Sequence, residues 1–215
     1  MLKIPVLPAF DKSDWDAVAA AFAGAPLLTL SQPWLPVPEE RFRSGEVRMG
    51  WRPGALWIRA LLDDECVICR ATAHNQYMWD MGDTFEMFVR AADAEEYFEL
   101  HATPSGHRLQ LGFASGQTIR QLRDQEVRLE DLVVEKPLFR FTTRAMAGGW
   151  EVLAEIPAST LRWPEEAMAG REILLSFGRF DAAADGSDPV MSCSSPHREL
   201  NFHLQQDWSS AVLTE

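Results

Sequence analysis

The sequence has few cysteines and no long hydrophobic run. Three of its 215 residues are cysteine, and an odd number argues against a complete disulfide framework. No segment approaches the ~20 apolar residues that a membrane-spanning helix needs. The N-terminus lacks both the apolar stretch of ~7 to 15 residues and the small-residue cleavage site of a signal peptide. The sequence therefore predicts a cytoplasmic protein without a membrane partner.

Positive charge is also scarce. Twenty basic residues stand against 32 acidic ones, which gives a net charge of −12 at pH 7. A surface this negative repels phosphate backbones and anionic lipids, so nucleic acid is not an expected partner. Neutral ligands such as sugars, and cations such as calcium, remain compatible with the charge.

The motifs of nucleophilic catalysis and of phosphate binding are missing. There is no G-x-S-x-G elbow, and Ser115 in the segment GFASG has no obvious neighbouring base. A glycine-rich phosphate loop is absent, and the five histidines show no metal-ligand spacing. We therefore expect a protein without catalytic activity.

Cys66 and Cys69 have the C-x-x-C spacing that redox and zinc motifs use at a turn or a helix start. The surrounding segment ECVICRA is apolar and β-branched, which favours a strand. Residues three apart in a strand point to opposite faces and lie about 10 Å apart, too far for a disulfide. We therefore predict that these are buried structural thiols.

Short alternating segments separated by turn residues about every ten positions are typical of a β-sandwich or barrel. A meander of antiparallel strands is predicted from the apolar-polar alternation of 84–90, 96–102 and 108–113. A hairpin is predicted where 138–146 and 150–157 flank two glycines.

The chain shows no internal repeat and no linker, so we predict one all-β domain. It spans residues 1–215, with residues 1–44 as an N-terminal segment packing on the sandwich and a short helix near 13–22. The sequence carries no signal for the oligomeric state.

Two groups of acidic residues each allow two interpretations. Glu86 and Glu99 point outward from neighbouring predicted strands. They could be the acid and partner carboxylate of a glycosidase, which lie about 5 to 10 Å apart, or part of an exposed acidic face, which we favour. Asp181, Asp185 and Asp188 lie in a glycine-containing loop that offers oxygens to calcium, but ordinary turn chemistry explains the same residues and is favoured.

The tryptophans separate by position. Trp57 and Trp150 lie within predicted strands and are expected in the core. Trp79 instead lies in a loop entering a strand, near Asp83 and Glu86. An aromatic ring beside carboxylates suits a sugar, because the ring stacks on the apolar face of a pyranose while the carboxylates accept hydrogen bonds from its hydroxyls.

The order of these segments resembles the family 9 carbohydrate-binding modules and the wider DOMON-like group. The resemblance rests on W-x-x-x-D-x-x-E-x-F-V from Trp79 to Val89, on Y-F-E-L at 97–100 with the turn T-P-S-G, and on the segments ALWIRALLDD, GGWEVLAEIPASTL, LLSFGRFDA, MSCSSP and NFH. It implies an all-β fold, a β-sandwich of two antiparallel sheets with short peripheral helices. It also implies a site on loops and a concave face, in which two tryptophans clamp the end of an oligosaccharide or glycan and calcium supports the loops.

The resemblance implies roles for individual residues. Trp79 matches the first clamp tryptophan, Glu86 the sugar-binding glutamate, and Asp83 an acidic residue that supports the loop. Glu99 and His101, outward on the next strand, complete the predicted ligand-binding set.

The sequence also departs from the family pattern. Ser192-Cys193-Ser194 replaces the motif S-W-S, and no second clamp tryptophan follows, which leaves Trp208 or His197 as substitutes. Phe98 and Glu99 stand where the family has an arginine on the strand after the motif.

Two further hypotheses stay open. Some DOMON-like relatives hold haem, for which Met78, Met81 and His203 are available. The missing clamp residue also favours a structural or interaction module whose sugar site has decayed.

Overall fold

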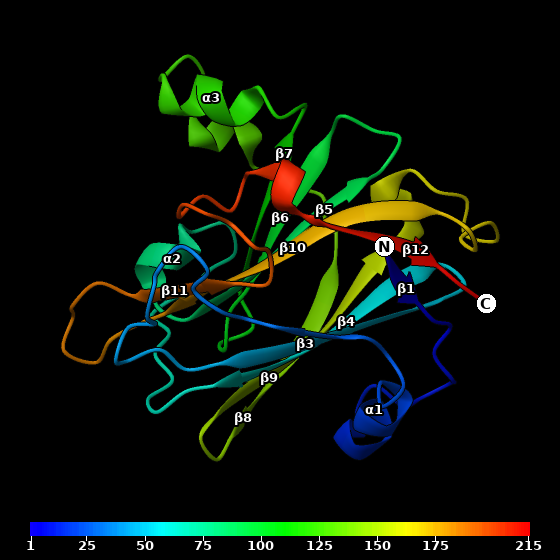
Figure 1. The fold of residues 1–215 in the computed structure, drawn as a ribbon, viewed down its shortest axis with the longest axis horizontal. Coiled ribbons are helices and arrows are strands. Elements are labelled where there is room, and N and C mark those ends of the chain that lie inside the picture. Colours follow the sequence, from blue (N-terminus) through cyan, green and yellow to red (C-terminus); the bar gives the residue numbers. More distant parts are fainter.

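The computed structural model describes residues 1–215, which form two β-sheets packed face to face (Figure 1). The seven-stranded sheet has the order β1 (Leu2–Ile4), β12 (Ser209–Leu213), β10 (Glu172–Asp181), β5 (Thr84–Ala91), β6 (Tyr97–Ala102) and β7 (Arg108–Phe113), with β11 (Val190–Cys193) also paired to β10. The five-stranded sheet has the order β2 (Leu27–Thr29), β3 (Gly45–Arg52), β4 (Ala55–Asp63), β9 (Gly149–Pro157) and β8 (Arg140–Met146). The predicted β-sandwich is confirmed, with one parallel pair, β1 with β12, among antiparallel neighbours.

The helices are short and peripheral. They are α1 (Trp15–Ala21), α2 (Met78–Met81), α3 (Thr118–Arg123) and the 3-10 turns η1 (Leu129–Leu132), η2 (Ala158–Leu161) and η3 (Gln205–Asp207). None of them has the length and apolar character needed to cross a bilayer.

Strand alternation builds the core between the sheets. Phe85, Met87 and Val89 of β5 point from the seven-stranded sheet towards Trp150 and Val152 of β9, and all five are fully buried. The predicted meander is present as β5, β6 and β7, in antiparallel register. The side chains that alternate with these along β5 and β6 therefore point away from the core, and they form the base of the candidate site.

The predicted hairpin is present as β8 and β9, with its turn at the two glycines. Gly149 has φ of +158°, and a Cβ there would lie 2.1 Å from the carbonyl oxygen of Leu62. Only glycine therefore allows β9 to start this close to β4. Trp57 and Trp150 are buried, as predicted.

The N-terminal segment adds one edge strand to each sheet. Strand β1 pairs with β12, and β2 pairs with β3. Between them, α1 begins after Asp14, whose carboxylate accepts hydrogen bonds from the amides of Asp16 and Ala17. The helix then packs Val18 against Trp57 on the outer face of the five-stranded sheet.

The prediction for the C-x-x-C segment is wrong. Strand β4 ends at Asp63, so Cys66 and Cys69 lie in a loop, where Cys66 is exposed and Cys69 half-buried. The reason is local: the Asp64 carboxylate accepts a hydrogen bond from the amide of Cys66 at 2.8 Å, which turns the chain out of the strand despite its β-branched residues. All three cysteines are free thiols, and only Cys193 is buried.

Candidate ligand-binding site

The outer face of the seven-stranded sheet is covered rather than open to water. Glu86 and Glu99 are only 2% and 5% exposed, so the favoured interpretation of an exposed acidic face is wrong. In Figure 1, α3 lies beyond this sheet, on the side away from the five-stranded sheet, and α2 lies next to β11, the short strand that pairs with β10. Together with the loop at 197–208 they enclose the outward side chains of β5, β6 and β7.

These covering elements leave a cavity of about 490 Å³, which we call the main cavity. Eleven of its sixteen lining residues are hydrophobic, and Trp79, Glu86 and Glu99 are among the sixteen. Ligand cavities in proteins have this size and this mixture of apolar walls with a few placed polar groups. The structure therefore brings three of the predicted ligand-binding residues to one site.

Trp79 lines the main cavity, and neighbouring aromatic rings hold its indole in place. Its ring stacks on Tyr77, with ring centres 5.5 Å apart and planes at 7°, and the Tyr77 hydroxyl donates to the Glu130 carboxylate. The His101 ring lies 5.5 Å away at 59°. A half-buried indole fixed by two other rings is a preformed stacking surface.

At the base of the cavity, His101 lies between two carboxylates. It is opposite Glu86 in the β5–β6 ladder, and Glu99 precedes it by two residues on the same face. His101 Nε2 lies 2.7 Å from Glu99 Oε1, a hydrogen bond, while Nδ1 lies 3.5 Å from Glu86 Oε1. His101 itself is fully buried and does not line the cavity, so its contacts here are with Glu86 and Glu99.

Burial and mutual interactions set the charges of the triad formed by Glu86, Glu99 and His101. Burial raises the pKa of Glu86 to about 8. Burial also acts to raise the pKa of Glu99, but the His101 hydrogen bond and the charges of His203 and His101 outweigh it and hold that pKa low. Burial acts to lower the pKa of His101, but Glu86 and Glu99 outweigh it and raise that pKa. At neutral pH these shifts leave an ionised Glu99, hydrogen-bonded to His101, beside a protonated Glu86.

A protonated Glu86 has a hydroxyl that donates and a carbonyl oxygen that accepts, whereas ionised Glu99 only accepts. His203 extends the polar base, because its Nδ1 lies 3.0 Å from the Tyr97 hydroxyl and its Nε2 lies 3.5 Å from Glu99 Oε2. The base of the cavity thus presents both donors and acceptors.

Leu200, Asn201, Phe202 and His203 form a wall of the cavity, and the sequence predicted a role only for His203, as a haem ligand. The signal in the sequence for the other three is the segment NFH at 201–203, which is part of the family resemblance. Phe202 approaches the sheet closely because β10 has glycine at 178, where a Cβ would lie 2.9 Å from the Phe202 ring. That Cβ would also lie 3.1 Å from Glu86 Oε2, so the glycine makes room for both the wall and the base.

Neither proposed substitute for the second tryptophan lines the main cavity. Trp208 is buried behind the wall, where its indole N–H donates to the carbonyl of Phe202 at 2.8 Å. His197 is buried beside Asp207, with 3.2 Å between Nδ1 and Oδ2. Trp208 therefore supports Phe202 and leaves the cavity with one tryptophan.

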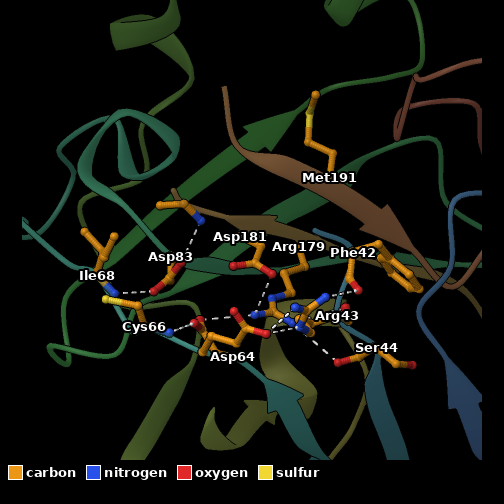
Figure 2. Close-up of polar contacts among 12 residues, drawn as sticks. Phe42, Arg43, Ser44, Asp64, Cys66, Ile68, Asp83, Arg179, Asp181 and Met191 are labelled. Atoms are coloured by element: carbon orange, nitrogen blue, oxygen red, sulfur yellow. Dashed lines mark hydrogen bonds and ion pairs between the residues drawn. The ribbon is translucent and has the colours of Figure 1, made fainter. Parts of the chain in front are cut away.

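Asp83 does not join the main cavity. Its carboxylate accepts hydrogen bonds from the amides of Ile68 and Ala182, the latter at 2.8 Å (Figure 2). These bonds tie the loop after β4 to the end of β10. Of the residues predicted to bind the ligand, Asp83 is the one that the structure places in a separate polar cluster.

One of the predicted calcium residues, Asp181, belongs to that cluster. Asp181 lies with Asp64 and Asp83, with ligand atoms within 4.8 Å of one another. Asp185 lines the same cavity as Asp64 and Asp181, but its carboxylate is outside the cluster and accepts hydrogen bonds from the amide and hydroxyl of Ser187. Asp188 uses its backbone carbonyl to accept from Arg41. The loop at 181–188 therefore does not turn its three carboxylates to one point.

Arg179 provides the positive charge inside this cluster (Figure 2). Its fully buried guanidinium lies 3.1 Å from Asp64 and 3.2 Å from Asp181. Burial, together with the charges of Asp64 and Asp181, raises the pKa of Asp83 to about 7. Calcium requires six to eight oxygens and would face the guanidinium at this position, so the cluster does not fit a calcium ion while Arg179 is there.

Comparison with known proteins places the fold. No family model and no curated protein matches the sequence. A structure described as a putative carbohydrate-binding protein from Bacteroides uniformis is similar over 99% of both chains, with a TM-score of 0.71 and 13% identity. A family 9 carbohydrate-binding module from Caldicellulosiruptor kristjanssonii with cellotriose has a TM-score of 0.65 and 11% identity over 99% of this chain and 93% of that one. The same organism's family 9 module with glucose has a TM-score of 0.63 and 13% identity, over 99% and 95%. The chain therefore has the β-sandwich fold of the family 9 carbohydrate-binding modules.

Proposed function

We propose that this protein is a non-catalytic carbohydrate-binding module that holds a sugar in the main cavity. The observation that carries the proposal is the meeting of Trp79, Glu86 and Glu99 at one largely apolar cavity, which residues 200–203 from a distant part of the chain also line. Similar structures hold cellotriose and glucose, which supports the same ligand class here.

Each polar group has a role that matches a sugar. The Trp79 ring stacks on the apolar face of a pyranose. Glu86, protonated at neutral pH, donates to one hydroxyl, while Glu99 accepts from another. The apolar residues around them contact the C–H surface of the ring and exclude water.

The haem hypothesis has less support. Of its three predicted ligands only His203 lines the main cavity, and Met78 is fully buried. Both nitrogens of His203 face protein oxygens, those of Tyr97 and Glu99. The hypothesis of a decayed site also has less support, since a cavity of about 490 Å³ remains between the wall and the base.

Titration calorimetry with glucose, cellobiose, cellotriose and xylobiose tests the proposal. We expect heat with at least one of these sugars, and about tenfold to hundredfold weaker binding after Trp79→Ala, which removes roughly 1 to 3 kcal/mol of stacking. Trp15→Ala is the matched control, because Trp15 is half-buried on α1 outside the cavity. A folded protein that gives no heat across a wide panel of neutral and acidic glycans would disprove the proposal.

A further inference from the structure

A second cavity of about 570 Å³, which we call the polar cavity, adjoins the main one. The two share four lining residues, Ile119, Arg123, Asn201 and His203. We propose that the polar cavity binds the anionic group of an acidic saccharide whose neighbouring sugar ring lies in the main cavity. This inference rests on the proposed function and specifies its ligand.

The two cavities differ in chemistry. Only two of the thirteen residues around the polar cavity are hydrophobic, against eleven of sixteen around the main cavity. Hydroxyls and charged substituents suit the polar cavity, and the C–H faces of a sugar ring suit the main cavity. A ligand that fills both must therefore carry a strongly polar part next to a ring.

The polar cavity concentrates positive charge in a protein whose net charge is −12. Arg90, Arg120 and Arg123 line it, and Glu95 is its one acidic residue. None of the three guanidinium groups has a carboxylate within 4.0 Å. Guanidinium groups bind carboxylate and sulfate oxygens through paired N–H donors, and these three have no such partner within the chain.

Other donors at the polar cavity also lack partners. Arg90 Nε and Gln205 Nε2 are buried without a hydrogen-bond acceptor. The Asn201 side-chain oxygen is already used, because it accepts from Arg123 Nη2 at 2.9 Å and from the amide of His203 at 3.3 Å. Its amide NH₂ group is left as a further donor. Unmatched donors call for a ligand that only accepts, as an anionic group does.

The spacing of β5 locates the charge relative to the sugar ring. Glu86, Phe88 and Arg90 lie on the same face, and Glu86 and Arg90 are four residues apart, about 13 Å along the strand. An anionic group near Arg90 therefore belongs to the sugar unit next to the one that contacts Glu86 and Trp79. The matching ligand is an acidic oligosaccharide rather than a single neutral sugar.

Calorimetry at low salt tests the inference with three ligands: cellobiose, its uronic acid form cellobiouronic acid, and a sulfated cellobiose. We expect an anionic form to bind about tenfold tighter than cellobiose, and this preference to fall at high ionic strength. The tighter of the two anionic ligands identifies the substituent.

Variants locate the effect. We expect Arg120→Gln and Arg90→Gln each to reduce the preference for the anionic form severalfold while leaving cellobiose binding as it is. Arg140→Gln removes the same charge from β8 in the other sheet, where Arg140 pairs with Glu155, and should change nothing. Equal binding of cellobiose and both anionic forms would overturn the inference and leave the proposed function standing. Equal losses in Arg120→Gln and Arg140→Gln would overturn it too. No binding of any of the three ligands would overturn the inference, and only a lack of heat across the wider glycan panel as well would remove the proposed function.

Discussion

Replacing Glu86 by glutamine tests whether the base of the cavity holds a neutral carboxylic acid. Glutamine has nearly the shape of a protonated glutamate but cannot ionise. Burial raises the pKa of Glu86 in the folded protein to about 8, from an ordinary 4.5. The folded state therefore holds this proton more tightly than the unfolded state, so Glu86 costs no stability below pH 4.5, an increasing amount between pH 4.5 and about 8, and a constant amount above that.

The magnitude follows from the shift. At 1.36 kcal/mol for each pKa unit, ionising Glu86 in the folded state costs at most about 5 kcal/mol above pH 8. Glu86→Gln lacks this cost. Its free energy of unfolding, relative to the unchanged protein, should rise by up to about 4 kcal/mol between pH 5 and pH 9.

Urea unfolding of both proteins at pH 5, 7 and 9 measures this difference. Glu46→Gln is the matched control, because Glu46 is an exposed carboxylate on β3 and its removal involves no buried charge. Parallel pH profiles for Glu86→Gln and the unchanged protein would refute the argument and place a carboxylate, not a carboxylic acid, in the cavity.

Other changes probe the wall and the polar cluster. Gly178→Ala should displace Phe202, weaken sugar binding and lower the free energy of unfolding by roughly 1 to 3 kcal/mol through overpacking. Gly24→Ala is the control, because no atom lies within 4 Å of its new Cβ. Equal sugar binding by both variants would show that the position of Phe202 does not depend on Gly178. Arg179→Met should lower the free energy of unfolding by about 3 to 5 kcal/mol, because Asp64 and Asp181 lose their buried partner. Since Arg179 fills the position of a cation, EDTA should leave the melting temperature of the unchanged protein where it is, and a clear drop would show that a metal ion binds there after all.

The sequence predicted the parts of the site that depend on local alternation. Once β5 and β6 are strands, Glu86, Glu99 and His101 must share one face, and adjacent pairing brings them together. It did not predict that this face is buried, because burial depends on α3 and the loop at 197–208, which pack on the sheet from distant parts of the chain. Phe202 and Asn201 were missed for the same reason.

The error at Cys66 and Cys69 has a different cause. Apolar and β-branched residues predicted a strand, but side-chain carboxylates took the amide hydrogens of Cys66 and Ile68 that a strand would have paired. Backbone donors bind the nearest strong acceptor, and an aspartate at either end of a short segment competes well with a neighbouring strand. The sequence contained both aspartates, but only the fold brings Asp83 to Ile68, fifteen residues earlier in the chain.

The absence of a second tryptophan changes how the site would hold a sugar, without removing the site. Two facing tryptophans bind a ring mainly by stacking from both sides. Here the cavity is lined by Trp79 and by a loop whose Phe202 reaches the sheet over Gly178 and is supported by Trp208. A single tryptophan offers less stacking area than two, so more of the recognition must come from the base, where a buried donor and acceptor cost little further desolvation when a ligand binds. Affinity that depends on Glu86 as a donor should then fall as the pH rises above about 8, whereas affinity from two stacked rings would not change.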